Sequence, residues 1–187
     1  QGSSDGAGTV NFNGSQTLAG NVGTSANSLA SVVLASSVAL TANEFNIDAT
    51  NITLGSGSTL TIGSGSVSGA VDGASASSGT VNFASTGAIT LASGTTIGST
   101  NGVAAVNVTG TSAVTANDAI KATTVTIGDG TNTASLSLAA SKAITGNVVI
   151  ADSGTLTLNN SSAVSGTIDG TSGAGTLTIA ASSSVTA

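Results

Sequence analysis

The most constraining feature of this chain is a short strand-like pattern that returns at a fixed interval. TLTI at Thr59–Ile62 returns as TVNF at Thr80–Phe83. TLTL at Thr155–Leu158 returns at the same interval as TLTI at Thr176–Ile179. In each segment polar residues alternate with large apolar ones, as in a strand with one buried face. A repeat of this length is typical of solenoids and other arrays.

A second, glycine-centred element follows each of these strands. It reads LAGNVG at 18–23, VSGAVDG at 67–73, ITGNV at 144–148 and VSGTIDG at 164–170. Glycine, serine and asparagine fill the intervals, as turns require. One repeat is therefore a strand, a turn, a glycine-centred strand and a second turn, which is the content of one β-helix coil.

We therefore predict an all-β fold, a parallel β-helix (β-solenoid) with coils of about 21 residues. It forms a single domain over residues 1–187, with about nine coils stacked at about 4.8 Å into a rod on the order of 40 Å long. The alternative is a β-sandwich of short strands, which the strand spacing also suits. The best helical candidate is 25–35, although its Val32-Val33 pair favours a strand.

Composition excludes several functions. The chain has no histidine and no cysteine, so a Ser–His pair or a cysteine nucleophile cannot be built. A net charge of −6 without a basic cluster argues against nucleic acid and anionic lipid as partners. No apolar run reaches the roughly 18–20 residues of a membrane span. Hydrophobic residues still make up 39% of the chain, which favours an ordered repeat over disorder.

The eight acidic residues give no clear catalytic pair. Asp72 and Asp169 occupy equivalent Asp-Gly dipeptides, for which we predict turns. Glu44 and Asp48 are the one close acidic pair, and as residues of one strand they would share a face. No arginine or aromatic platform accompanies them to hold a sugar. We therefore predict that the protein is not an enzyme, with no catalytic residue and no cofactor.

Three further features could be sites of metal binding or covalent modification: one aspartate, the two lysines and three asparagines. Asp129, in GDGTN at 128–132, is the candidate calcium ligand, with a turn as the alternative, and it lacks the repeated GGxGxD signature of calcium-binding solenoids. Lys121 or Lys142 could form an isopeptide crosslink. Asn51, Asn107 and Asn160 begin glycosylation acceptor patterns, which also arise by chance in a chain this rich in Asn, Ser and Thr.

The sequence GTVNFNGSQTLAGNVGTSANSLASVVL, at 8–34, resembles repeats in the passenger regions of rickettsial outer-membrane autotransporters, the large surface-layer-like adhesins. The later GTLTL and GTLTI segments, at 154–158 and 175–179, resemble the same repeats. The resemblance implies a secreted, solenoidal protein of a cell surface. It transfers no catalytic residue.

The two ends of such a rod are predicted to be its assembly edges. Terminal β-helix coils expose strand edges that recruit other strands unless they are capped, and we see no amphipathic capping helix at either end. The chain starts at Gln1 without a signal segment, which fits a mature exported chain or an excised fragment. The outermost clear strands supply the predicted edge residues: Gly8, Thr9, Val10, Asn11, Phe12, Thr176, Leu177, Thr178 and Ile179.

We therefore expect a non-catalytic extracellular structural protein of a microbial cell surface, a surface-layer, fibre or filament subunit that self-assembles with copies of itself. One alternative is an adhesin passenger segment that binds host or neighbouring cells. Another is an ice-binding solenoid, because Thr-x-Thr strands at 59–61, 155–157 and 176–178 would present ordered hydroxyls if they stacked on one flat face.

Overall fold

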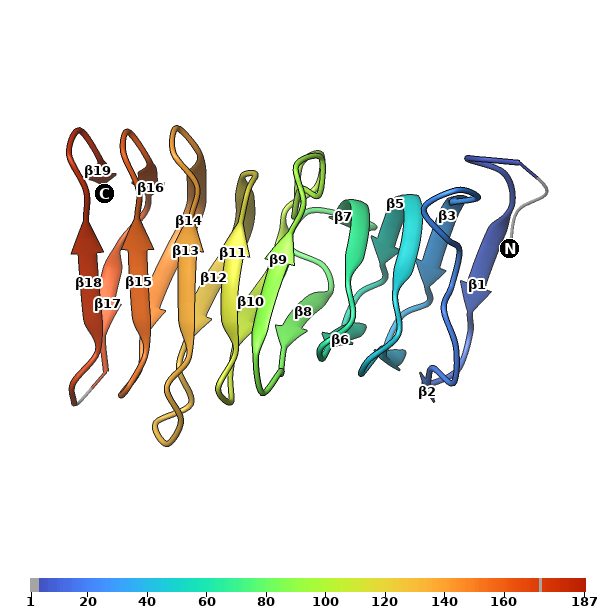
Figure 1. Ribbon diagram of the computed structural model, residues 1–187, viewed down its shortest axis with the longest axis horizontal. Helices are drawn as coiled ribbons and strands as arrows, with labels where there is room; N and C mark the ends of the chain where they lie inside the picture. Colours follow the sequence, from blue (N-terminus) through green and yellow to red (C-terminus); the bar gives the residue numbers. More distant parts are fainter. Residues whose placement is uncertain (1–3, 172) are drawn as a thin grey trace.

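The computed structural model describes residues 4–171 and 173–187, and it shows a parallel β-helix of about eight turns (Figure 1). Every pairing between its named strands is parallel. This confirms the predicted β-solenoid with a repeat of about 21 residues. The β-sandwich alternative is wrong, because successive short strands join stacked coils and do not form hairpins.

Short strands separated by turns make up the described chain. In order they are β1 (Thr9–Phe12), β2 (Gln16–Thr17), β3 (Leu29–Leu34), β4 (Ala39–Thr41), β5 (Ile47–Leu54), β6 (Thr59–Ile62), β7 (Val67–Gly73), β8 (Thr80–Phe83), β9 (Ala88–Leu91), β10 (Val103–Val108), β11 (Ala113–Ala116), β12 (Ile120–Ile127), β13 (Ser135–Leu138), β14 (Ala143–Ile150), β15 (Thr155–Leu158), β16 (Ala163–Ser165), β17 (Ile168–Gly170), β18 (Thr176–Ile179) and β19 (Ser184–Thr186).

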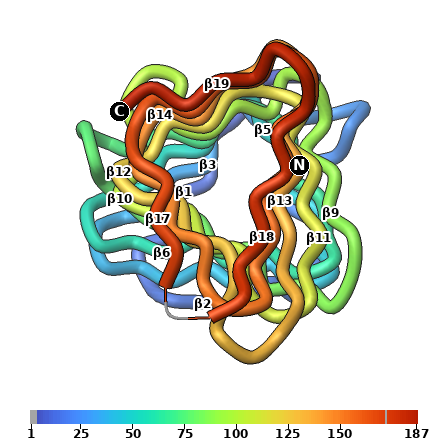
Figure 2. The backbone as a smooth tube through the Cα atoms, turned by 90° about the vertical axis from the view of Figure 1, so that its left-hand side faces the viewer, coloured from blue at the N-terminus to red at the C-terminus, as the bar shows by residue number. Residues whose placement is uncertain are grey.

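Three sheets form the walls of the rod, which Figure 2 shows from its C-terminal end. One has the order β1-β3-β5-β7, a second has the order β2-β4-β6-β8-β10-β12-β14-β16-β19, and the third has the order β9-β11-β13-β15-β18. The repeat read from the sequence is the stacking register itself, since Thr59 pairs with Thr80 and Thr155 pairs with Thr176.

One inward-facing column of β-branched residues runs the whole length of the rod. Register pairs and single bridges link its members in order: Val10, Val32, Ile52, Val71, Ile97, Ile120, Ile144, Val164 and Val185. The seven inner members are at most 2% exposed. Each coil buries little apolar surface alone, so the stability of the rod comes from this stacking.

The glycine-centred element marks a corner where one strand passes from one wall to the next. Gly146 lies inside β14 with a φ of 133°, and a Cβ there would overlap the carbonyl oxygen of Ala122 in the coil below. The register between β12 and β14 shifts at this point. Gly69 in β7 approaches Ala49 in the same way. A residue without a side chain is therefore required at this corner.

Two predictions of local structure are wrong. The helical candidate at 25–35 contains β3, and Val32 and Leu34 are fully buried in the core. The LAGNVG segment at 18–23 forms no strand and contributes a single bridge, from Val22 to Ile47. In the first of these segments the pairing available from the neighbouring coil overrides local preference.

The acidic residues also lie elsewhere than predicted. Asp72 and Asp169 are on strands β7 and β17 and not in turns, because each pairs in register with a residue of the preceding coil. Glu44 lies in the turn before β5, whereas Asp48 lies on β5, so the two do not share a strand. The carboxylate of Asp48 instead accepts a hydrogen bond from Ser68 Oγ at 2.9 Å.

The coils differ in length, which explains why about eight turns form and not the nine predicted. Phe83 pairs with Val108, and Val108 pairs in turn with Ile127, so the first of these two coils contains more residues than the second. The long coil contains the segment between β9 and β10, which forms no named strand and whose β-bridges to the neighbouring coils are those of Ile97. The wall that begins with β1 is therefore interrupted in the middle of the rod.

Candidate functional site

The C-terminal coil exposes the apolar residues that every inner coil buries. Leu177 is 40% exposed, Ile179 49% and Val185 41%, and these are the large exposed hydrophobic residues of the described chain. The residues stacked beneath them, Leu156, Leu158 and Val164, are fully buried. The exposed face is thus the cross-section of the core. It is built by the same alternation that buries these positions elsewhere.

The N-terminal coil presents the other end of the same core. Thr9–Phe12 form β1, the first strand of its sheet, and Gly8 precedes it with a φ of 84°. Val10 is half-buried, whereas Phe12 is 8% exposed. Within residues 4–171 and 173–187, β3 is the strand that pairs with β1, so the outer edge of β1 has no strand against it.

The two predicted edges lie on different walls of the rod. Strand β18 ends the third sheet, whereas Val10 of β1 belongs to the column that ends at Val185 in β19. Sequence reasoning missed β19, because SVT at Ser184–Thr186 is short and polar. The available signal was the spacing, since Val185 follows Val164 at the same interval at which Thr176 follows Thr155.

A regular surface of hydroxyl groups covers the third sheet. Its outward residues form one column of Thr90, Thr115, Ser137, Thr157 and Thr178 and a second column of Ala88, Ala113, Ser135, Thr155 and Thr176. Neither column contains a charged residue. The TLTI strand at Thr59–Ile62 lies in another sheet, so the single array predicted from three Thr-x-Thr strands is divided between two walls.

Asp129 is engaged by amide groups of the turns around it. Its carboxylate accepts hydrogen bonds from the backbone amides of Thr131, Asn132 and Gly110 and from Asn132 Nδ2, at 2.8 to 3.0 Å. The side-chain bond from Asn132, followed by the backbone amides, holds the pKa of this carboxyl well below its usual range. In the part of the chain that the structure describes, no three potential metal-binding side chains gather around it or elsewhere.

The two lysines have different environments. Lys142 Nζ donates to Asp118 Oδ1 at 2.7 Å, and this bond, with one from the amide of Gly94, lowers the pKa of Asp118. The pair is an ion pair between stacked coils. Lys121 is exposed on β12 beside a small pocket and forms no ion pair with the described residues.

The described residues contain no helix that could cross a membrane. Comparison of the chain with protein-family models, with curated proteins and with solved structures finds no match. The functional assignment therefore depends on the surfaces of the rod.

Proposed function

We propose that the protein is a structural rod of a microbial cell surface that assembles end to end with copies of itself. One observation carries the proposal: the core column is continuous through the rod, from the half-buried Val10 at one end to Val185, which is 41% exposed, at the other. The resemblance of residues 8–34 to autotransporter passenger repeats supports the extracellular location. No chemical step is part of this role.

The chemistry of the two ends supports head-to-tail stacking. In a straight stack, Val185 of one copy covers Val10 of the next, and β19 adds to the free edge of β1 as a further coil would. This buries apolar surface and satisfies backbone groups together, which is how edge strands recruit partners. The contact joins two different surfaces, so repeating it gives an open filament and not a closed ring.

The stack fits best along the wall that contains Val10. Away from that wall, the apolar residues of the first coil are the half-buried Leu18 and Val22, and this coil has no strand that could pair with β18. Leu177 and Ile179 therefore contribute less to the interface than Val185. Of the two edges predicted from the sequence, the stack therefore relies on the one in β1 more than on the one in β18.

Electron cryomicroscopy of the purified protein tests the proposal. We expect filaments with a strand spacing of about 4.8 Å along the axis and a subunit repeat of roughly 40 Å. Val185→Lys places a charge in the apolar interface and should abolish the filaments. Thr157→Lys, on a side wall, is the matched control and should leave them intact. A wild-type protein that stays monomeric at all concentrations would contradict the proposal.

The hydroxyl columns of the third sheet favour ice binding as a second candidate function. Five hydroxyl-bearing residues from Thr90 to Thr178 stand in register on adjacent strands, which lie about 4.8 Å apart. Such a surface is uncharged and repeats in two directions, so it can hold water in an ordered layer.

Thermal hysteresis measurements test the second candidate. Wild-type protein should depress the freezing point without a matching change in the melting point, and Thr157→Tyr should remove this activity by interrupting the column. Thr126→Tyr places the same side chain outward on β12, in another sheet, and should have no effect. If wild-type protein shows no hysteresis and no shaping of ice crystals, this candidate is excluded.

A further inference from the structure

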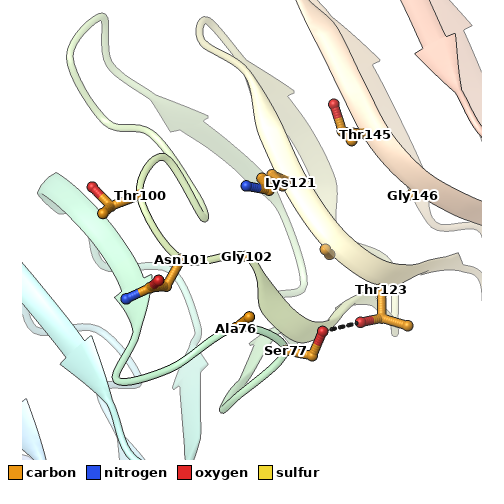
Figure 3. Close-up of a pocket in the computed structure, with 10 residues that line it drawn as sticks. Ala76, Ser77, Thr100, Asn101, Gly102, Lys121, Thr123, Thr145 and Gly146 are labelled. Carbon is orange, nitrogen blue, oxygen red and sulfur yellow. Dashed lines mark hydrogen bonds between the residues drawn. The ribbon is translucent and has the colours of Figure 1, made fainter.

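One of the surface pockets of the rod lies where the wall that begins with β1 is interrupted. The segment between β9 and β10, which contains Thr100, Asn101 and Gly102, lies beside the segment between β7 and β8, which contains Ala76 and Ser77 (Figure 3). Between these two segments and strands β12 and β14 lies a pocket of about 180 Å³. A repeat protein gains stability from regular stacking, so irregularities in a repeat are expected at functional sites.

Hydrogen bonds fix the walls of this pocket. Ser77 donates its backbone amide to the carbonyl of Gly102 at 2.7 Å, and Thr123 Oγ1 donates to Ser77 Oγ at 2.8 Å from a distant part of the sequence (Figure 3). Ser77 has a φ of 57°, a conformation that costs energy in a residue with a side chain. The projecting segment is thus held in one position against β12.

Lys121 supplies a positive charge at this pocket. Its ammonium group has no carboxylate within 4.0 Å among the described residues, although the chain carries eight acids and two basic residues. The carboxylate of Asp72 already accepts hydrogen bonds from Ser99 Oγ and from the backbone amide of Thr100, both in the segment between β9 and β10. The ammonium of Lys121 is therefore available to an anion from solution.

Gly102 sets the path of the lysine side chain. A Cβ at this position would lie 3.3 Å from Lys121 Cγ and 3.6 Å from Lys121 Cε, so the absence of a side chain lets the lysine stem lie close to the segment between β9 and β10. The same pocket is also lined by Ser77, Thr123 and Thr145, which carry hydroxyls, and by Asn101, which carries an amide. These groups can both donate and accept hydrogen bonds.

We propose that this pocket binds a carboxylated sugar, a single uronic-acid-like ring whose carboxylate pairs with Lys121. One compact ammonium matches one carboxylate, whereas a phosphate dianion is better bound by several donors or by arginine. The surrounding hydroxyls and amide suit the hydroxyls of a sugar. The volume is below the roughly 300 Å³ at which pockets for drug-sized ligands begin, so one ring is the appropriate size.

Ligand-observed saturation-transfer NMR with D-glucuronate tests this proposal, and it works on single rods and on filaments alike. We expect a Kd on the order of 1 mM, as for a ligand of about a dozen heavy atoms at an open site. D-glucose, which lacks the carboxylate, should bind at least roughly tenfold more weakly, because the ion pair is lost. Phosphate should not compete at equal concentration.

Matched variants locate the site. Lys121→Gln should weaken glucuronate binding at least roughly tenfold, and Gly102→Ala should weaken it with the charge retained. Lys142→Gln removes the other lysine, which is paired with Asp118 outside the pocket, and should leave binding unchanged. Three results would overturn the proposal: equal binding of glucose and glucuronate, competition by phosphate, or equal losses in the two lysine variants. The proposal does not depend on end-to-end assembly, because none of these residues lies in a terminal coil.

Discussion

The corner at Gly146 gives the sharpest test of how the rod is built. Gly146→Ala places a Cβ against the carbonyl oxygen of Ala122 in the adjacent coil, at a φ of 133°. The backbone conformation alone costs about 1–3 kcal/mol for a residue with a side chain. Relief of the overlap must displace one coil from the next, and overpacking of this kind costs a further ~1–3 kcal/mol. We therefore expect a loss of about 2–6 kcal/mol in the free energy of unfolding.

Two other glycines separate these contributions. Gly130 has a φ of 81°, but a Cβ there would meet no atom within 4 Å, so Gly130→Ala should cost only the conformational part, about 1–2 kcal/mol. Gly87 has neither a positive φ nor a close neighbour, so Gly87→Ala should change stability by less than about 1 kcal/mol in either direction.

Urea unfolding followed by circular dichroism measures all three variants under one set of conditions. The expected order of destabilisation is Gly146, then Gly130, then Gly87. If Gly146→Ala is no less stable than Gly130→Ala, the coils are not in the close contact described at this corner, and the explanation of the glycine-centred element is wrong.

Two further predictions concern the core and the turns. Leu136→Ala, at a fully buried position, should lower the free energy of unfolding in urea by about 2–5 kcal/mol. Leu177→Ala, in the same column, should cost much less in single rods because that side chain is 40% exposed. Equal losses in the two variants would contradict the inward-facing column. Asp129 has a lowered pKa when folded, so its stabilising effect is present above the ordinary value of 3.8 and is lost as the pH falls through the folded pKa. Wild-type protein should therefore lose more stability than Asp129→Asn between about pH 4 and pH 2, and parallel stability curves would show that these hydrogen bonds do not form.

The architecture could be predicted from the sequence because, in a β-helix, residues that pair between neighbouring coils are separated in the sequence by the length of one coil. Thr155 and Thr176 are one coil apart in the sequence and paired in space. The alternation of apolar residues identified inward positions such as Leu156 and Leu158, both of which are fully buried. In a fold made of nearest-neighbour contacts, local pattern and tertiary contact carry the same information.

Local propensity misled the prediction where a neighbouring coil supplied a pairing partner. The Asp-Gly dipeptides at Asp72 and Asp169 are typical of turns. Both aspartates nevertheless lie on strands, because a strand of the preceding coil pairs with them in parallel. The pocket at Lys121 was also missed as a binding site. It depends on how two segments of irregular length fold over β12, and no repeat interval determines that arrangement.

Mixing of two end variants tests the proposed head-to-tail assembly most directly. Val10→Lys blocks the first coil and Val185→Lys blocks the last, so each variant alone should sediment as a single 17.3 kDa species in analytical ultracentrifugation. Val10→Lys retains an unblocked C-terminal coil, and Val185→Lys retains an unblocked N-terminal coil. Mixed in equal amounts, the two variants should therefore form a heterodimer that grows no further. A dimer of Val10→Lys alone would show that copies join through two C-terminal ends, and that result, or filaments formed by either variant, would contradict head-to-tail stacking.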